Sequence, residues 1–121
     1  MDLVDVADVE ESLDAHGARY VDTVLGPTEV ATNRMRTPRD LAMAFGAKEC
    51  VLKLLEVGDD DAIDWRSIEL RPRGTRAWDV VLSGAAAALA DHKGIGSISV
   101  SVGATSSVVT AVAVAEPNGW N

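Results

Sequence analysis

The sequence predicts an α+β fold, in which an antiparallel sheet packs against a long central helix. The chain has 121 residues, the size of one compact domain, and 47% of them are apolar, enough to form a core. A helical repeat of apolar residues occupies the middle of the chain, and alternating strand patterns come in pairs joined by short turns. We expect this single domain to cover residues 1–116, with a loose tail at residues 117–121.

The first part of the chain predicts one strand followed by helices. Leu3–Val6 alternates well enough for a strand that begins almost at the first residue. Asp8–His16 has a helical pattern, and Gly17 is a typical helix end. Pro27, placed at a first helical position, predicts a second helix that carries Glu29 to about Met35.

The middle of the chain predicts the longest helix, from Pro38 to about Val57. Its large apolar residues recur at helical spacing: Leu41, Phe45, Leu52 and Leu55. Gly58 is a candidate end for this helix, and an exposed acidic turn is expected at Asp59–Asp61.

The second half predicts two strand pairs separated by one helix. Four segments alternate as strands do: Ser67–Arg71, Trp78–Leu82, Ile95–Val102 and Ser107–Ala115. The first two should pair through a turn at Arg73–Arg76, and the last two through a turn near Gly103–Ser106. Between the pairs, Ser83 is expected to cap an alanine-rich helix that runs to His92.

Charge and composition exclude several classes of partner. The formal net charge of -8 argues against a nucleic-acid surface and against an anionic membrane, which both require clustered cations. Cys50 is the only cysteine, so no internal disulfide can form. With no signal-like start and no apolar run long enough to span a bilayer, the simplest expected location is the cytoplasm.

Three charged residues interrupt the apolar central helix in the stretch FGAKECVLKLL. Glu49 and Lys53 are four residues apart with the acid first, which suits a helix-surface pair worth about 0.3–0.5 kcal/mol. Lys48, on the side of Phe45 and Leu52, could extend its ammonium group out of an apolar face. Spacing alone therefore favours a structural explanation for all three charges.

Strings along nearly the whole chain favour a functional explanation instead. The start, MDLVDV, matches a G-[IV]-G-x-D-[IL]-V-[ED]-[IV] strand from its aspartate onward, and FGAKECVLK matches F-x-A-K-E with its following lysine. WRSIEL corresponds to W-x-D-I-E-[VI], and GTRAWDVVLSG to G-x-P-x-[VI]-x-L-x-G. SISVS followed by AVAVAE corresponds to the last strands. In these strings and their order, the chain resembles 4′-phosphopantetheinyl transferases of the holo-acyl-carrier-protein synthase type.

The resemblance implies transfer of 4′-phosphopantetheine from coenzyme A to a serine of an acyl carrier protein, in fatty-acid, polyketide or other secondary-metabolite biosynthesis. It implies that Asp2 and Glu49 hold Mg²⁺, since hard carboxylate oxygens suit that ion. Lys53 would face the phosphates and could protonate the leaving 3′,5′-ADP, while Lys48 and Gly58 would contact coenzyme A. Members of this type are also homotrimers, with each active site at a subunit boundary.

Five positions depart from the family pattern. Ala44, Val57 and Val100 stand where the family has an arginine, a threonine and a histidine near the phosphates. Glu56 adds a negative charge that would repel a pyrophosphate. Glu11 stands where the family has an arginine that docks the acidic carrier protein, so the first helix is acidic here. A substitute basic patch could come from four other arginines, although an ordinary solvated face is favoured for them: Arg19, Arg34, Arg36 and Arg39.

These departures leave two alternatives open. A repurposed member could have lost coenzyme A binding and use Asp2, Glu49 and Lys53 for acid–base chemistry on a small or carrier-bound acyl intermediate. Dehydration, cyclisation or isomerisation would suit such a site, and activity would survive removal of metal. A non-catalytic interaction protein is the other alternative, and it gives no reason for the retention of these three residues.

Overall fold

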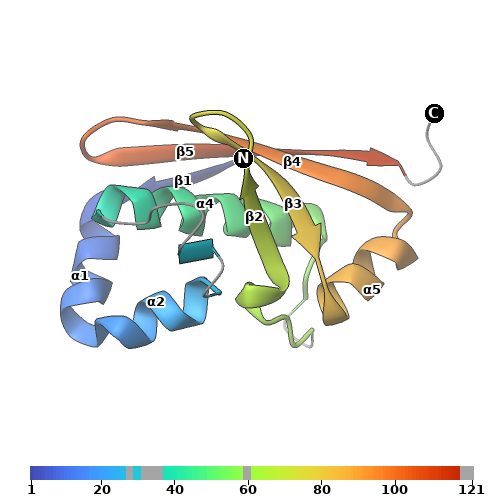
Figure 1. The fold of residues 1–121 in the computed structure, drawn as a ribbon, viewed down its shortest axis with the longest axis horizontal. Coiled ribbons are helices and arrows are strands. Elements are labelled where there is room, and N and C mark those ends of the chain that lie inside the picture. Colours follow the sequence, from blue (N-terminus) through green and yellow to red (C-terminus); the bar gives the residue numbers. More distant parts are fainter. Residues whose placement is uncertain (27–28, 31–36, 59–60, 118–121) are drawn as a thin grey trace.

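A five-stranded antiparallel sheet organises the fold, with strand order β1-β5-β4-β3-β2. The computed structural model describes residues 1–26, 29–30, 37–58 and 61–117. Over these residues the described helices all lie on one face of the sheet, as Figure 1 shows. The predicted α+β fold, with an antiparallel sheet against a long central helix, is confirmed.

The strands are β1 (Asp2–Asp5), β2 (Ile68–Pro72), β3 (Ala77–Leu82), β4 (Ile95–Ala104) and β5 (Val108–Pro117). The helices are α1 (Val6–His16), α2 (Ala18–Val24), α4 (Pro38–Leu54) and α5 (Gly84–His92), with a 3-10 turn η1 at Trp65–Ser67. Each predicted strand lies within a few residues of its expected position. Both predicted hairpins, β2–β3 and β4–β5, are paired as expected.

Two elements differ from the predictions. Helix α2 was not predicted, because its seven residues carry no clear apolar repeat and it follows directly on Gly17, whose φ of 53° turns the chain. Helix α4 ends at Leu54 rather than Val57, because Glu56 takes a left-handed φ of 54° before Gly58 is reached. Glu29 and Val30 are helical as predicted.

Several predictions fall outside the described residues. They are the start of the second predicted helix at residues 27–28 and its continuation through residues 31–35, the first part of the acidic turn at residues 59–60, and the tail at residues 118–121. Pro117, predicted as the first residue of that tail, is instead the last residue of β5. In the described ranges, no helix has both the length and the apolar character needed to cross a membrane.

Helix α4 begins at a capping box. The Thr37 hydroxyl accepts from the Asp40 backbone N–H at 3.1 Å, and the Asp40 carboxylate accepts from the Thr37 N–H at 3.1 Å. Pro38 occupies the first turn, where its missing N–H costs nothing. These contacts fix the start of the helix that carries Lys48, Glu49 and Lys53.

The two faces of the sheet have different environments. On β5, Val109 and Ala111 point inward and are fully buried among the residues of the core. The alternate residues Val112 and Val114 point outward and are 41% and 58% exposed. Leu3 on the neighbouring β1 is 67% exposed and pairs in register with Thr110. The outer face of the sheet is therefore apolar around β1 and β5, and no described helix covers it (Figure 1).

Candidate functional site

A close approach of α4 to β1 builds the first part of the site. A Cβ added at Gly46 would lie 3.1 Å from Cγ2 of Val4 and 3.6 Å from Cβ of Ala111. Only a glycine lets the helix lie this near the strand without displacing it. Successive side chains of a strand alternate, so Asp2 faces the helix as Val4 does. One turn beyond Gly46, Glu49 reaches the same end of β1.

Asp2, Glu49 and Lys53 form a cluster at this contact. The Lys53 ammonium donates to Asp2 Oδ1 at 2.7 Å. The Lys53 side chain is 58% exposed and that of Asp2 is 14% exposed, so the cluster opens to solvent. The sequence prediction that the metal carboxylates and the lysine lie together thus agrees with this geometry, and their catalytic roles stay a prediction.

The charges of the cluster perturb one another. Burial raises the pKa of Glu49 above its usual range, and the nearby Asp2 carboxylate raises it further, while Lys53 opposes both effects. The hydrogen bond to Asp2 raises the pKa of Lys53, so its ammonium form is favoured. Two carboxylates repel each other here beside a single cation, so binding of a second cation would reduce that repulsion.

The donor set of the cluster fits Mg²⁺. Asp2 and Glu49 supply hard carboxylate oxygens from two rigid elements, and Mg²⁺ commonly uses one or two carboxylates together with substrate phosphates and water. No group of three His, Cys, Asp or Glu side chains able to hold a metal occurs among the residues that the structure describes. The remaining ligands of such an ion would therefore be phosphates and water.

Lys48 lies elsewhere and is completely buried. Its ammonium donates to the Val24 carbonyl at 2.6 Å, to Glu29 Oε1 at 2.6 Å and to the Trp65 carbonyl at 2.9 Å. Burial lowers the pKa of Lys48, and the hydrogen bond and charge of Glu29 oppose that shift. The expectation that Lys48 extends its charge out to solvent is wrong, because the apolar face of α4 is covered by α2 and η1. Its ammonium, with three acceptors already bound, is not placed beside Asp2 and Glu49.

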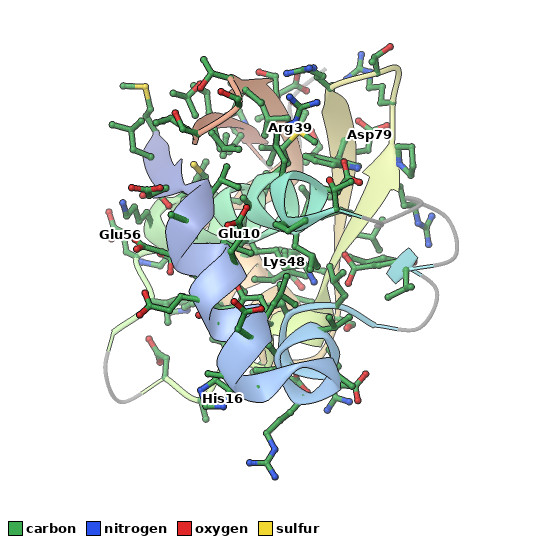
Figure 2. The ribbon with its side chains drawn as sticks, turned by 90° about the vertical axis from the view of Figure 1, so that its left-hand side faces the viewer. Glu10, His16, Arg39, Lys48, Glu56 and Asp79 are labelled. Atoms are coloured by element: carbon green, nitrogen blue, oxygen red, sulfur yellow. The ribbon has the colours of Figure 1, made fainter. Side chains whose placement is uncertain are left out.

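The segment after α4 holds Glu56 and Gly58. The Gly58 N–H donates to Asp61 Oδ2 at 2.8 Å, so this amide is already engaged within the loop. Glu56 is 79% exposed and accepts from the Lys93 ammonium at 3.1 Å, which offsets part of its negative charge. Figure 2 shows Glu56 at the periphery of the molecule. A contact of Gly58 with coenzyme A stays a prediction.

Two of the family departures belong to the core. Val100 is 2% exposed in the middle of β4, and Ala44 on α4 has no exposed surface. The phosphate contacts that the family pattern implies at these two positions stay predictions.

A second feature was not predicted from the sequence. Phe45 and Trp65 stack with ring centroids 5.0 Å apart and planes 29° from parallel. They form part of a mostly apolar hollow of about 440 Å³, here called the aromatic hollow, which is lined by His16, Arg19, Tyr20, Thr23, Val24, Phe45 and Trp65. Phe45 belongs to the predicted apolar repeat of the central helix, and the unpredicted α2 supplies most of the remaining wall. Without α2, these residues had no reason to be grouped.

Comparisons with known proteins agree with the resemblance. The sequence profile of the 4′-phosphopantetheinyl transferase superfamily matches residues 1–113. A holo-[acyl-carrier-protein] synthase of Moorella thermoacetica is 35% identical over 119 residues, covering 96% of this chain and 91% of the relative. One from Paramagnetospirillum magneticum is 38% identical over 92 residues, covering 73% of this chain and 68% of the relative.

A solved structure extends the similarity to the fold. The holo-[acyl-carrier-protein] synthase of Helicobacter pylori, crystallised in complex with coenzyme A, superposes with a TM-score of 0.80 at 23% identity. The match covers 95% of this chain and 96% of that one. The element order and sheet described above are thus those of a known fold over nearly the whole chain.

Proposed function

The chain belongs to the 4′-phosphopantetheinyl transferase superfamily, and we propose that it is a holo-acyl-carrier-protein synthase. It would transfer 4′-phosphopantetheine from coenzyme A to a serine of an acyl carrier protein. The observation that carries this proposal is the cluster of Asp2, Glu49 and Lys53, which joins two carboxylates and a solvent-facing ammonium at one end of β1. Relatives that match most of the chain carry the same named activity.

The cluster suits a transfer in which positioning and charge stabilisation do the catalytic work. Asp2 and Glu49 would hold Mg²⁺, which would neutralise pyrophosphate charge. The serine oxygen forms a bond to the phosphorus next to the pantetheine, and the bond from that phosphorus to 3′,5′-ADP breaks. Lys53, held in its ammonium form by Asp2, would stabilise the negative charge of the leaving 3′,5′-ADP, while the serine proton passes to solvent.

The aromatic hollow is the surface that we assign to the carrier protein. It offers stacked rings from Phe45 and Trp65 beside the basic side chain of Arg19, and aromatic residues together with arginine are typical of binding hot spots. Arg19 would supply the contact to an acidic carrier that the acidic α1 does not. Of the other arginines considered for this role, Arg34 and Arg36 lie outside the described residues.

The uncovered sheet face supports the expected homotrimer. Val112, Val114 and Leu3 leave an apolar patch on β5 and β1, and a symmetric contact between copies would bury it. The patch lies on the same β1 that carries Asp2, so a neighbouring copy would come close to the cluster. A reducing cytoplasm remains the expected location, since Cys50 is a free buried thiol.

The test is a transfer assay with an apo acyl carrier protein, coenzyme A and Mg²⁺, followed by intact-protein mass spectrometry. Wild-type protein should add one phosphopantetheine group, and a chelator should stop the reaction. Glu49→Gln should abolish transfer, whereas Glu10→Gln on exposed α1 should not. No transfer by folded wild-type protein, or full activity of Glu49→Gln, would reject the proposed role of the cluster.

A second candidate function has one observation in its favour. The raised pKa of Glu49 beside Lys53 also suits proton transfer on an acyl or polyketide-like intermediate, without coenzyme A. Such activity would persist in a chelator and would be lost in both Glu49→Gln and Lys53→Met. Calorimetric titration of coenzyme A with and without Mg²⁺ separates the candidates, because only the transferase needs metal-dependent binding of coenzyme A.

A further inference from the structure

The buried pair of Lys48 and Glu29 connects several segments of the chain. Lys48 has no exposed surface and Glu29 is 2% exposed. Besides accepting from Lys48, the Glu29 carboxylate accepts from the Gly26 N–H and from the Leu70 N–H, each at 3.0 Å. The pair therefore links α4, the end of α2, residue 29 and the edge strand β2. Figure 2 shows Lys48 near the middle of the molecule.

Two of the acceptors of Lys48 belong to the aromatic hollow. Its ammonium binds the carbonyls of Val24, at the end of α2, and of Trp65, in η1. Val24 and Trp65 both line the hollow, and they come from elements far apart in the sequence. Phe45, another lining residue, lies one helical turn before Lys48 on α4. One ammonium group thus ties three lining residues to one another from the interior side.

A buried ion pair of this kind is expected to fix the positions of the groups it binds and to add little to the free energy of unfolding. Removing two charges from water is expensive, and buried ion pairs replaced by apolar residues often leave stability unchanged or improved. The pair does restrain local geometry, because an ammonium with three bound acceptors fixes the positions of all three relative to one another. The Trp65 carbonyl lies in a single 3-10 turn, where it also accepts from the backbone N–H of Ile68, the first residue of β2.

We propose that Lys48, held by Glu29, is a positioning residue that sets the spacing of the Val24 and Trp65 walls of the aromatic hollow and thereby the affinity for the carrier protein. The proposal rests on the proposed function, because the occupant of the hollow is the carrier protein of the transfer reaction. It assigns Lys48 no contact with coenzyme A and no part in the chemistry at Asp2, Glu49 and Lys53.

The test uses the double variant Lys48→Met with Glu29→Gln. Lys48→Met alone would leave a buried carboxylate without its cation and could prevent folding. In the double variant no unpaired charge remains at this pair. The side-chain amide oxygen introduced by Glu29→Gln can still accept a backbone N–H. The carbonyls of Val24 and Trp65 lose the Lys48 ammonium, and the Trp65 carbonyl keeps the hydrogen bond from the Ile68 N–H. The control, Arg73→Gln, removes an exposed ion pair to Asp79 at the β2–β3 turn, far from α2 in Figure 1.

The expected result is a change confined to the carrier protein. The KM for the carrier protein should rise by at least about tenfold, while kcat stays within about threefold and the KM for coenzyme A is unchanged. The indole N–H resonance of Trp65, assigned by its loss in Trp65→Phe, should shift or broaden, and that of Trp78 should not. The control should leave all of these values at wild-type levels.

Other outcomes overturn the proposal. An unchanged KM for the carrier protein would show that the pair is structural only. So would a fall in kcat accompanied by equal rises in the KM for the carrier protein and the KM for coenzyme A. An unchanged Trp65 resonance would show that the wall does not depend on Lys48. If the wild-type protein does not transfer phosphopantetheine, the proposed function fails, and the Trp65 resonance still decides whether Lys48 positions the wall.

Discussion

Replacing Gly46 with alanine tests whether the close approach of α4 to β1 builds the site. The added Cβ would lie 3.1 Å from Cγ2 of Val4, well inside the usual carbon–carbon separation of about 3.5–4.0 Å. Alanine favours a helix interior over glycine by about 1 kcal/mol, whereas overpacking a core costs about 1–3 kcal/mol. The cost of overpacking should exceed the gain in helix propensity, so Gly46→Ala should lower the free energy of unfolding by about 1 kcal/mol.

The partner of this contact can be removed as a check. In a Val4→Ala background the clashing methyl group is gone, so Gly46→Ala should instead stabilise the protein by about 1 kcal/mol through helix propensity. The two substitutions should therefore couple by about 2 kcal/mol, a magnitude seen for residues in direct contact. Urea unfolding of the four proteins, with the m-value checked for constancy, measures this coupling.

The same substitution has a functional consequence. Asp2 lies on the same face of β1 as Val4, so a displaced strand would move Asp2 away from Lys53 and Glu49. Gly46→Ala should reduce Mg²⁺-dependent transfer under conditions where the variant is still fully folded. A stabilising effect of Gly46→Ala in the wild-type background, or additive effects in the double variant, would refute the close-packing argument.

Three further predictions concern the cluster and the sheet face. Lys53→Met should lower the single-turnover rate constant about 100-fold, the usual cost of removing one group that stabilises developing charge, and an unchanged rate constant would exclude that role. In the presence of a chelator, the raised pKa of Glu49 means that the folded protein holds the Glu49 proton more tightly than the unfolded chain does. The resulting contribution to the free energy of unfolding is fully present at low pH and is lost as the pH rises through the raised pKa. Urea unfolding from pH 4 to 8 should therefore show Glu49→Gln gaining stability relative to wild type as the pH rises, and a constant difference would contradict the shift. Val114→Lys should dissociate the expected trimer, as measured by light scattering, while Glu10→Lys should not. A trimer in both variants would show that the β5 face has no role in assembly.

Local patterns predicted most of the fold because each had a local cause. Pro38 marked the start of α4, where the structure shows the Thr37 capping box, and side-chain alternation marked the strands. Helix α2 was missed because its boundary depends on the positive φ of Gly17 and on packing of the helix against α4, neither of which leaves an apolar repeat in seven residues. The end of α4 was misplaced for a similar reason, since Glu56 adopts a conformation that is rare for residues other than glycine.

The candidate site divides in the same way. The strings around Asp2, Glu49 and Lys53 grouped these residues from the sequence alone, and the 2.7 Å contact between Asp2 and Lys53 agrees with that expectation. Lys48 was grouped with them because the family string F-x-A-K-E contains it next to Glu49. Adjacent residues on a helix point about 100° apart, so Glu49 faces β1 while Lys48 faces the interior beneath α2.

The sequence by itself determined the order of the strands, the helices other than α2, the family resemblance and the charges at one end of the central helix, because these follow from local periodicity and from strings of neighbouring residues. Only the tertiary structure decided which of those charges meet. The burial of Lys48 against Glu29, the core position of Val100 and the aromatic hollow all arise where segments far apart in the chain pack together. Such packing depends on long-range contacts, and local sequence patterns do not predict which residues form them.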